Sequence, residues 1–341
     1  MLRETVREIS HEPALVHCSS IIVLETNELF CVWYEGPYET SSQTVLRCAK
    51  RAGTTGNEVE GWARPETLLK INAVPLGNPV LWRDSDGRIR LLFSMLVAES
   101  WAEGILLEMY SDDECSSWSS PYLFYGRKGF MPKTRPQRLS SGGLVVPLYH
   151  EAEFCPYILV MNDDEAPFNA GLVGETMARG KVIQPALVEL SDGSIMLLGR
   201  SRTGWVSKSM SYNAGNSWAI CSDTGIPNPN SAIDLLRAHG GPDERYDTLY
   251  LVGNIHPHSR GELSVLLSFD SGATWTHRIP VISGAGEYSY PSAITTGDSA
   301  LWIAYTEDRY RIRAVRISAD ELATNAIPVE YLTGPDTEVI V

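Results

Sequence analysis

The feature that most constrains the fold is an internal repeat. Six times along the 341 residues, a short apolar run is followed by a polar turn and a second apolar run. Strands rich in Val, Ile, Leu, Trp and Tyr around such turns are typical of β-hairpins, so the chain is predicted to be all-β. The hairpins are SSIIVLETNELFCVWYEG from Ser19, NPVLWRDSDGRIRLLF from Asn78, RPQRLSSGGLVVPLY from Arg135, QPALVELSDGSIMLLG from Gln184, NSAIDLLRAHGG through DTLYLVG from Asn230, and YPSAITTGDSALWIAYT from Tyr290.

A second motif, which we call the box segment, falls between the hairpins. It holds Ser, Asp or Asn, Gly and Trp at fixed offsets in SFDSGATW (268–275) and SYNAGNSW (211–218), with a worn copy in SDDECSSW (111–118). These residues suit a tight turn, because Asp or Asn caps backbone amides, Gly takes a positive φ and Trp fills the gap between sheets. We therefore expect a structural role for this motif.

The spacing of the box segments predicts the number of blades. From 211 to 268 is 57 residues, and from 111 to 211 is 100, so the second gap holds two units with a degenerate box around MNDDEAPF (161–168). The six hairpins then form a six-bladed β-propeller of four-stranded antiparallel blades around a central channel. We expect one domain over residues 1–341, closed by pairing strands from the two termini, with a short helix and tail after about residue 318.

Charge and composition exclude several function classes. The 42 acidic residues outnumber the 28 basic ones, the net charge is −14, and no Lys/Arg block would bind a phosphate backbone, so no nucleic acid is expected. No apolar run reaches the length of a membrane span. The start of the chain has no apolar signal region and the six cysteines have no metal spacing, so we expect reduced thiols, a cytoplasmic protein and no cofactor. The oligomeric state is left open.

The residues that open the innermost strands are the first candidates for a site. In a propeller these strands begin near the mouth of the central channel, so polar residues at their starts converge. We predict that they line one pocket for a saccharide or other small molecule; the alternative is that they satisfy backbone groups around the channel. The set comprises His17, Asn78, Arg135, Gln184, Asn230 and Tyr290.

Two further arginines are candidates for anion binding. Arg200 and Arg260 follow inner hairpins, and paired guanidinium groups near one channel suit a carboxylate. The alternative is an ion pair with Glu35, Asp234 or Glu262.

Other charged groups are expected to be structural. His256 and His258 in NIHPHSRG have no third ligand at a fitting spacing, so no metal site is predicted. Arg309, Arg311 and Arg313 alternate along one strand, which is typical of a solvated blade face, although Arg311 is placed where it can reach the channel rim.

With its hairpins and box segments, the chain resembles the sialidase (BNR/Asp-box) superfamily over nearly its whole length. The resemblance implies three arginines for a substrate carboxylate, a Tyr nucleophile activated by a Glu, and a loop Asp as acid and base. LLGRSRTGW matches the second arginine at Arg200, HPHSRGELSVLLSFDSGATW matches the third at Arg260, and EYSYPSAITTGD matches the nucleophile at Tyr290.

Three family positions differ in this chain. VHCSSIIVL replaces the Arg-Ile-Pro segment, which puts His17 at the first arginine, or Cys18 if the register shifts by one. Gln184 stands where the activating Glu is expected, and Tyr38 and Glu39 are nearest to the place of the loop Asp. A tyrosine is a poor nucleophile without an anionic neighbour to take its proton. The resemblance therefore implies a propeller enzyme other than a standard sialidase.

Three functions fit this sequence. The first is a glycosidase-like or lyase-like enzyme on a carboxylate-bearing carbohydrate, in which Arg200 and Arg260 hold the anion and His17 and Tyr290 move protons. Similar propellers include uronate-linked polysaccharide lyases in which His and Tyr do acid–base work. The second is a dehydratase or cyclase of the pericyclase type in small-molecule biosynthesis, and the third is a non-catalytic sugar-binding propeller. Two arginines within reach of one carboxylate favour the first, and an apolar aromatic pocket favours the second.

Overall fold

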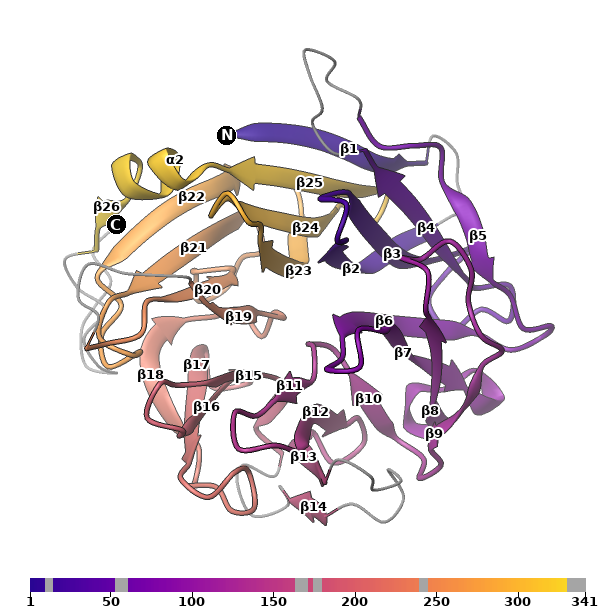
Figure 1. The fold of residues 1–341 in the computed structure, drawn as a ribbon, viewed down its shortest axis with the longest axis horizontal. Helices are drawn as coiled ribbons and strands as arrows, with labels where there is room; N and C mark the ends of the chain where they lie inside the picture. Colours follow the sequence, from indigo (N-terminus) through magenta and orange to yellow (C-terminus); the bar gives the residue numbers. More distant parts are fainter. Residues whose placement is uncertain (10–14, 53–60, 163–170, 174–179, 239–244, 330–341) are drawn as a thin grey trace.

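The computed structural model describes residues 1–9, 15–52, 61–162, 171–173, 180–238 and 245–329. They form six antiparallel sheets arranged as blades around a common axis (Figure 1), which confirms the predicted six-bladed propeller. Four sheets have four strands, and blades 3 and 5 carry a fifth. The degenerate box predicted around 161–168 lies mostly outside the described residues.

The first three blades run in chain order from residue 15 to residue 173. Two short 3₁₀ helices, η1 (Val97–Glu99) and η2 (Trp101–Glu103), stand before the third strand of blade 2. The strands are β2 (Leu15–Val23), β3 (Leu29–Gly36), β4 (Val45–Arg51) and β5 (Glu66–Leu69) in blade 1; β6 (Leu76–Arg83), β7 (Ile89–Leu96), β8 (Gly104–Ser111) and β9 (Tyr122–Tyr125) in blade 2; and β10 (Phe130–Pro132), β11 (Gln137–Arg138), β12 (Leu144–His150), β13 (Cys155–Met161) and β14 (Gly171–Val173) in blade 3.

The last three blades follow the same antiparallel order. The strands are β15 (Val182–Glu189), β16 (Ile195–Ser201), β17 (Trp205–Ser211) and β18 (Ser222–Pro227) in blade 4; β19 (Asp234–Arg237), β20 (Leu249–Gly253), β21 (Glu262–Ser268), β22 (His277–Ser283) and β26 (Ile327–Pro328) in blade 5; and β23 (Tyr288–Thr295), β24 (Leu301–Glu307), β25 (Arg311–Ile317) and β1 (Leu2–Glu8) in blade 6.

The ring closes through its first strand. β1 pairs antiparallel with β25, so the outermost strand of blade 6 comes from the start of the chain (Figure 1). After β25 the short helix α2 (Ala319–Thr324) follows, with a capping box between Ser318 and Glu321. Both features agree with the sequence-based expectation. No helix among the described residues is long and apolar enough to cross a membrane.

Each described box segment is the turn between the third and fourth strands of its blade. In blade 5, the Ser268 hydroxyl accepts the Gly272 N–H at 2.8 Å and Asp270 accepts the Thr274 N–H at 2.8 Å. Gly272 has φ 74°, as expected for its left-handed position. Trp275 is buried beside residues of blade 4 that include Met196. The box tryptophan therefore fastens one blade to the preceding blade.

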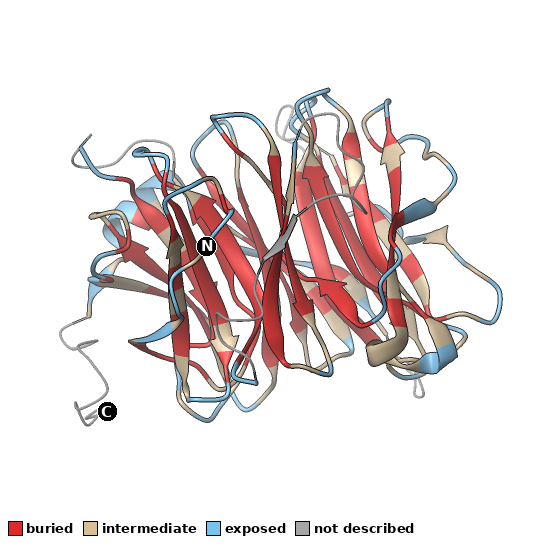
Figure 2. Cartoon of the chain, turned by 90° about the horizontal axis from the view of Figure 1, so that it is seen from below, coloured by how far each residue is buried: buried red, intermediate tan, exposed pale blue. Residues whose placement is uncertain are grey.

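The hydrophobic core lies between neighbouring blades and continues around the ring. In Figure 2, buried residues run through the middle of the strands and exposed residues concentrate in the turns. The strands are apolar on both faces because each sheet is covered by a blade on either side. This leaves the polar residues at strand starts as exceptions that require hydrogen-bond partners.

A bulge interrupts the inner strand near its start in four blades. Pairing with the second strand shifts after His17, Gly77, Ile183 and Ser289. The following residue has a positive φ in every case, and a residue before β19 shares this conformation. Left-handed backbone is costly for non-glycine residues, so its recurrence marks a shared constraint. The five residues are Cys18 (φ 55°), Asn78 (47°), Gln184 (53°), Asn230 (53°) and Tyr290 (55°).

Blade 3 differs because its inner strand is broken in two. β10 ends at Pro132 and β11 begins after Pro136, and proline lacks the N–H that a continuous ladder needs. The intervening side chains of Lys133 and Thr134 are buried. They bond to the carbonyls of Pro291 (3.1 Å) and Pro185 (2.6 Å), which lie in the bulges of blades 6 and 4.

Candidate functional site

The five positive-φ residues, four of them in bulges, define the register of the site. Cys18, and not His17, is the residue of blade 1 that matches Asn78, Gln184 and Tyr290 of the other bulges. His17 stands one residue earlier, yet its ring contacts that of Tyr290 with centroids 4.1 Å apart. The structure therefore brings the two predicted proton-moving residues together across the closing point of the ring.

Arg200 organises the hydrogen bonds around Tyr290. Its Nε donates to Asn230 Oδ1 at 2.9 Å, and its guanidinium nitrogen donates to Gln184 Oε1 at 3.0 Å and to the Tyr290 hydroxyl at 3.3 Å. Because Gln184 Oε1 faces Arg200, the Gln184 amide nitrogen donates to Tyr290, also at 3.3 Å. The Tyr290 oxygen thus accepts from two donors, and in the described part of the chain no carboxylate bonds to it.

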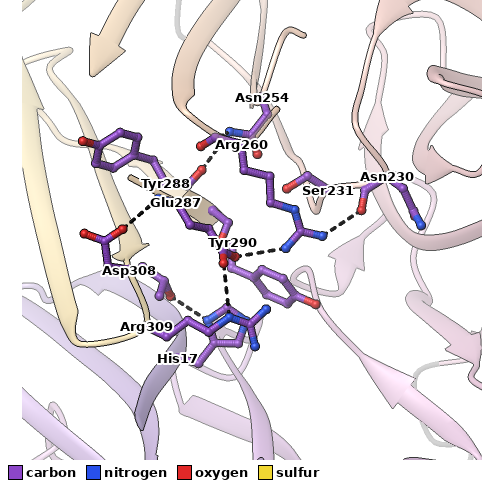
Figure 3. A network of polar contacts seen from close by, with 12 residues as sticks. His17, Asn230, Ser231, Asn254, Arg260, Glu287, Tyr288, Tyr290, Asp308 and Arg309 are labelled. Carbon is purple, nitrogen blue, oxygen red and sulfur yellow. Dashed lines mark hydrogen bonds and ion pairs between the residues drawn. The ribbon is translucent and has the colours of Figure 1, made fainter. Parts of the chain in front are cut away.

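Two more arginines meet at Glu287, as Figure 3 shows. Arg260 donates to Glu287 Oε1 at 3.0 Å and to the Asn230 carbonyl at 2.9 Å, while Arg309 donates to Glu287 Oε2 at 3.3 Å. Arg309 also pairs with Glu39. Burial alone would raise the pKa of Glu287, but the Ser289 hydroxyl and the two arginines outweigh it and lower that pKa. Glu287 is therefore ionised and orients both guanidinium groups.

The groups described so far form one cluster, which comprises His17, Gln184, Arg200, Asn230, Arg260, Glu287, Tyr290 and Arg309. The electrostatics of this cluster keep His17 neutral. Burial lowers its pKa well below the ordinary value, and the charges of Arg309, Arg260, Lys133 and Arg200 lower it further. His17 Nδ1 lies 3.1 Å from the Thr306 hydroxyl, and buried Nε2 has no hydrogen-bond partner among the described residues. One ring nitrogen is thus held in place while the other is available for proton transfer.

Tyr149 supports the cluster from blade 3. Its hydroxyl accepts from Asn78 Nδ2 at 3.1 Å and lies 3.4 Å from Gln184 Nε2. Burial, followed by the charges of Glu151 and Tyr290, raises the pKa of Tyr149 well above the ordinary value. It remains protonated, and it connects Asn78 to the other predicted residues. The sequence pattern does not single out Tyr149, because this residue lies within an ordinary apolar strand.

Arg135 does not join the other predicted residues, which corrects the expectation. Its guanidinium bonds to Asp234 Oδ2 at 3.0 Å and to the Ala293 carbonyl, one step further along the inner strands. The break in blade 3 displaces the chain, so that Lys133 takes the place facing Tyr290. Its Nζ lies 5.6 Å from the centroid of that ring.

The alternating arginines also differ from the prediction. Arg309 reaches the cluster from the turn between β24 and β25, whereas Arg311 pairs with Glu8 and Arg313 with Glu307. The expectation that Arg311 could reach the rim is therefore wrong. The arginine of this segment that reaches the cluster is Arg309. The ion pair expected as the alternative role of Arg260 exists, but with a different partner. Arg260 pairs with Glu287, which is not one of the three carboxylates named from the sequence.

The thiol and imidazole groups at the other noted positions have structural environments. Burial raises the pKa of Cys18 to about 11, so its thiol stays protonated at neutral pH and is a weak nucleophile. His256 Nδ1 accepts the backbone N–H groups of His258 and Ser259, which stiffens the loop. Within the described ranges, no group of three His, Cys, Asp or Glu side chains could hold a metal ion.

A cavity of about 670 Å³ lies at the opposite ends of the inner strands and does not include the cluster. Arg135, Arg138 and Arg237 line it, and each is paired with an aspartate. The cluster remains the better candidate site, because it joins an imidazole of strongly lowered pKa, whose buried Nε2 has no partner among the residues described, to three partly exposed arginines.

Comparisons with solved structures show the same fold. The Hadza microbial sialidase Hz136 is 15% identical with a TM-score of 0.74, covering 90% of this chain and 66% of the sialidase, so this chain spans slightly less than two thirds of its length. A mutant of the NanB sialidase from Streptococcus pneumoniae is 10% identical (TM-score 0.76; 93% and 71% covered). The intramolecular trans-sialidase from Ruminococcus gnavus, in complex with oseltamivir carboxylate, is 14% identical (TM-score 0.72; 90% and 95% covered).

A comparison with curated proteins finds no match. A comparison with protein families matches residues 27–303 to the family described as BNR repeat-like domain. This match extends over most of the chain and includes at least part of each of the six blades, in agreement with the sialidase-like propeller. The chain therefore belongs to the family of BNR repeat-like domain proteins.

Proposed function

We propose that the cluster binds a carboxylate-bearing saccharide and cleaves a glycosidic bond by elimination. The observation that carries the proposal is the convergence of Arg200, Arg260 and Arg309 beside the contacting rings of His17 and Tyr290. Arg200 and Arg260 both bond to Asn230, through its side chain and its carbonyl, so the two guanidinium groups are close enough to share one anionic ligand.

Arg309 supplies the third positive charge from blade 6. The resemblance implies an arginine at the start of the first inner strand, where this chain has the neutral His17. The Arg309 carbonyl accepts the Val16 N–H at 2.8 Å, which brings the turn of blade 6 against that strand. A carboxylate as the recognised group is further supported by the oseltamivir carboxylate in the similar propeller from Ruminococcus gnavus.

Elimination fits the surroundings of Tyr290 better than a covalent tyrosyl intermediate. Three arginines would neutralise the substrate carboxylate and thereby acidify the hydrogen on its α-carbon. One member of the His17 and Tyr290 pair removes that proton, the β-carbon–oxygen bond breaks, and the other member protonates the leaving oxygen. The product then carries a carbon–carbon double bond conjugated with the carboxylate. This route does not need the activating Glu that Gln184 replaces.

The test is a product analysis on uronate-containing polysaccharides, with sialosides and neutral polysaccharides alongside. Elimination yields both new chain ends and the ultraviolet absorbance of the conjugated double bond, whereas hydrolysis yields chain ends without it. His17→Ala and Tyr290→Phe should each lower turnover by about a hundredfold or more. Sialoside hydrolysis at an ordinary enzymatic rate, or binding without any product, would contradict the proposal.

A further inference from the structure

Lys133 is an unusual residue in this structure because it is a buried lysine that has no acidic partner in the described part of the chain. Its exposed fraction is 5%, and its only hydrogen bond among the described residues runs from Nζ to the Pro291 carbonyl at 3.1 Å. Burying an ammonium group away from any carboxylate is costly, so such a residue is retained only where its charge or its bond is used.

The fold places this charge behind Tyr290. The break between β10 and β11 lets Lys133 leave blade 3 and reach the bulge of blade 6, where Pro291 follows the positive-φ residue Tyr290. The bond to the Pro291 carbonyl holds the strained turn, and the ammonium lies 5.6 Å from the centroid of the Tyr290 ring. Lys133 therefore contacts both the backbone and the aromatic face of one functional residue.

The remaining groups around Tyr290 are mostly cationic or neutral. Two donors point at its oxygen, and the ionised Glu287 is bound by Arg260 and Arg309 and not by Tyr290. The titratable and charged groups that face Tyr290 or this cluster are His17, Cys18, Tyr34, Lys133, Tyr149, Arg200, Arg260, Glu287 and Arg309, with Glu39 and Glu151 farther out.

We propose that Lys133 is a positioning residue that fixes the Tyr290–Pro291 turn and stabilises the phenolate form of Tyr290. Its charge would take over the support of Tyr290 that the resemblance assigns to a glutamate, at the position where this chain has Gln184. The importance of this role for catalysis rests on the proposed function, because there Tyr290 moves a proton. The electrostatic effect itself does not, since a positive charge facing the Tyr290 ring, 5.6 Å from its centroid, favours the phenolate whether or not a substrate is turned over.

The experiment follows Tyr290 ionisation without any substrate. The protein is produced with 3-fluorotyrosine, and the fluorine NMR signal of position 290 is identified as the one that Tyr290→Phe removes. The titration midpoint of this signal is then measured in the wild-type protein and in Lys133→Gln, which keeps a donor for the Pro291 carbonyl but removes the charge. We expect the midpoint in Lys133→Gln to rise by about 1 to 2 pH units.

Matched variants distinguish the effect of the Lys133 charge on the titration midpoint from an effect on the fold. Lys208→Gln is the control, because Lys208 also donates to a backbone carbonyl of the next blade, that of Gly272 at 3.0 Å, but lies on β17 away from Tyr290. It should leave the midpoint unchanged, and Lys133→Arg should keep it near the wild-type value. If Lys133→Gln does not fold, Lys133→Met is titrated instead.

A midpoint that does not rise in the folded charge-free variant overturns the proposal. A raised midpoint in a protein that shows no elimination activity would leave the role of Lys133 standing and reject only the proposed function. Conversely, elimination activity with an unchanged midpoint would retain the proposed function and reject Lys133 as its electrostatic support.

Discussion

His17 is buried among cationic side chains, and this makes the stability of the folded protein sensitive to acid. Its pKa in the folded protein is well below the ordinary value of histidine, so below about pH 6.5 the unfolded chain binds more protons than the folded one. Below this pH, the free energy of unfolding therefore decreases as the pH is lowered.

We predict that His17 contributes a loss of about 1 kcal/mol in the free energy of unfolding between about pH 6.5 and 5.5. His17→Gln should remove this contribution and flatten the pH dependence, as measured by urea unfolding at several pH values. His258→Gln, in an exposed loop, is the control and should retain the wild-type slope. Equal slopes for wild type and His17→Gln would argue against a neutral buried imidazole.

Arg309 provides a test of anion binding at the level of one side chain. Arg309→Gln should weaken binding of an anionic saccharide by about 2 kcal/mol, because it removes a charged donor, and should barely affect a neutral saccharide. Arg311→Gln is a matched control from the same segment, since Arg311 pairs with Glu8 away from the cluster. Calorimetric titration of both ligands measures the difference, and equal losses in the two variants would remove Arg309 from the site.

Single residues also show why only part of the site was predictable from the sequence. Gln184, Arg200 and Tyr290 were predictable because each stands at a fixed place in a repeat. Lys133 and Arg309 were not, because they reach the cluster from a broken strand and from a turn, and sequence spacing does not encode contacts across a ring. The register difference between His17 and Cys18 has a similar origin, since a bulge shifts the pattern by one residue.

At the scale of elements, the hairpins were predictable because their signals are local. Turn residues such as Asp and Gly lie between apolar runs, and the box segments repeat at blade spacing. The split inner strand of blade 3 was missed, although Pro132 and Pro136 bracket it and proline is unsuited to a central strand. Those two prolines were the available signal for the displacement of Arg135.

The box segment of blade 5 supplies the prediction at this scale. Trp275→Ala should lower the free energy of unfolding by about 3 kcal/mol or more, because it opens a cavity in the core between blades 4 and 5. The ligand affinity of the remaining folded protein should be unchanged, since Trp275 is not among the cluster residues. Ile220→Ala is the control, because Ile220 is 79% exposed and its truncation should cost little. A loss of affinity without a loss of stability would contradict the blade assignment.

The whole molecule depends on the closure of its ring. β1 covers the outer edge of β25, and Glu4 on β1 bonds to the buried Arg51 of blade 1 at 2.7 and 2.8 Å. Closure brings β2 beside β23, and with them His17 beside Tyr290. The candidate site is therefore complete only when the first and last blades meet.

We predict that deletion of residues 1–9 lowers the melting temperature and promotes self-association, because it exposes the β25 edge and leaves Arg51 without its carboxylate. It should also impair the site, since β1 holds blade 6 against blade 1, where His17 and Tyr290 lie. A synthetic peptide of residues 1–9 added in trans should restore both the melting temperature and ligand binding, whereas a peptide of scrambled sequence should not. Calorimetry and analytical ultracentrifugation measure these effects. A truncated protein with the same association state and stability as the intact protein, and fully able to bind, would show that the other strands close the ring without β1.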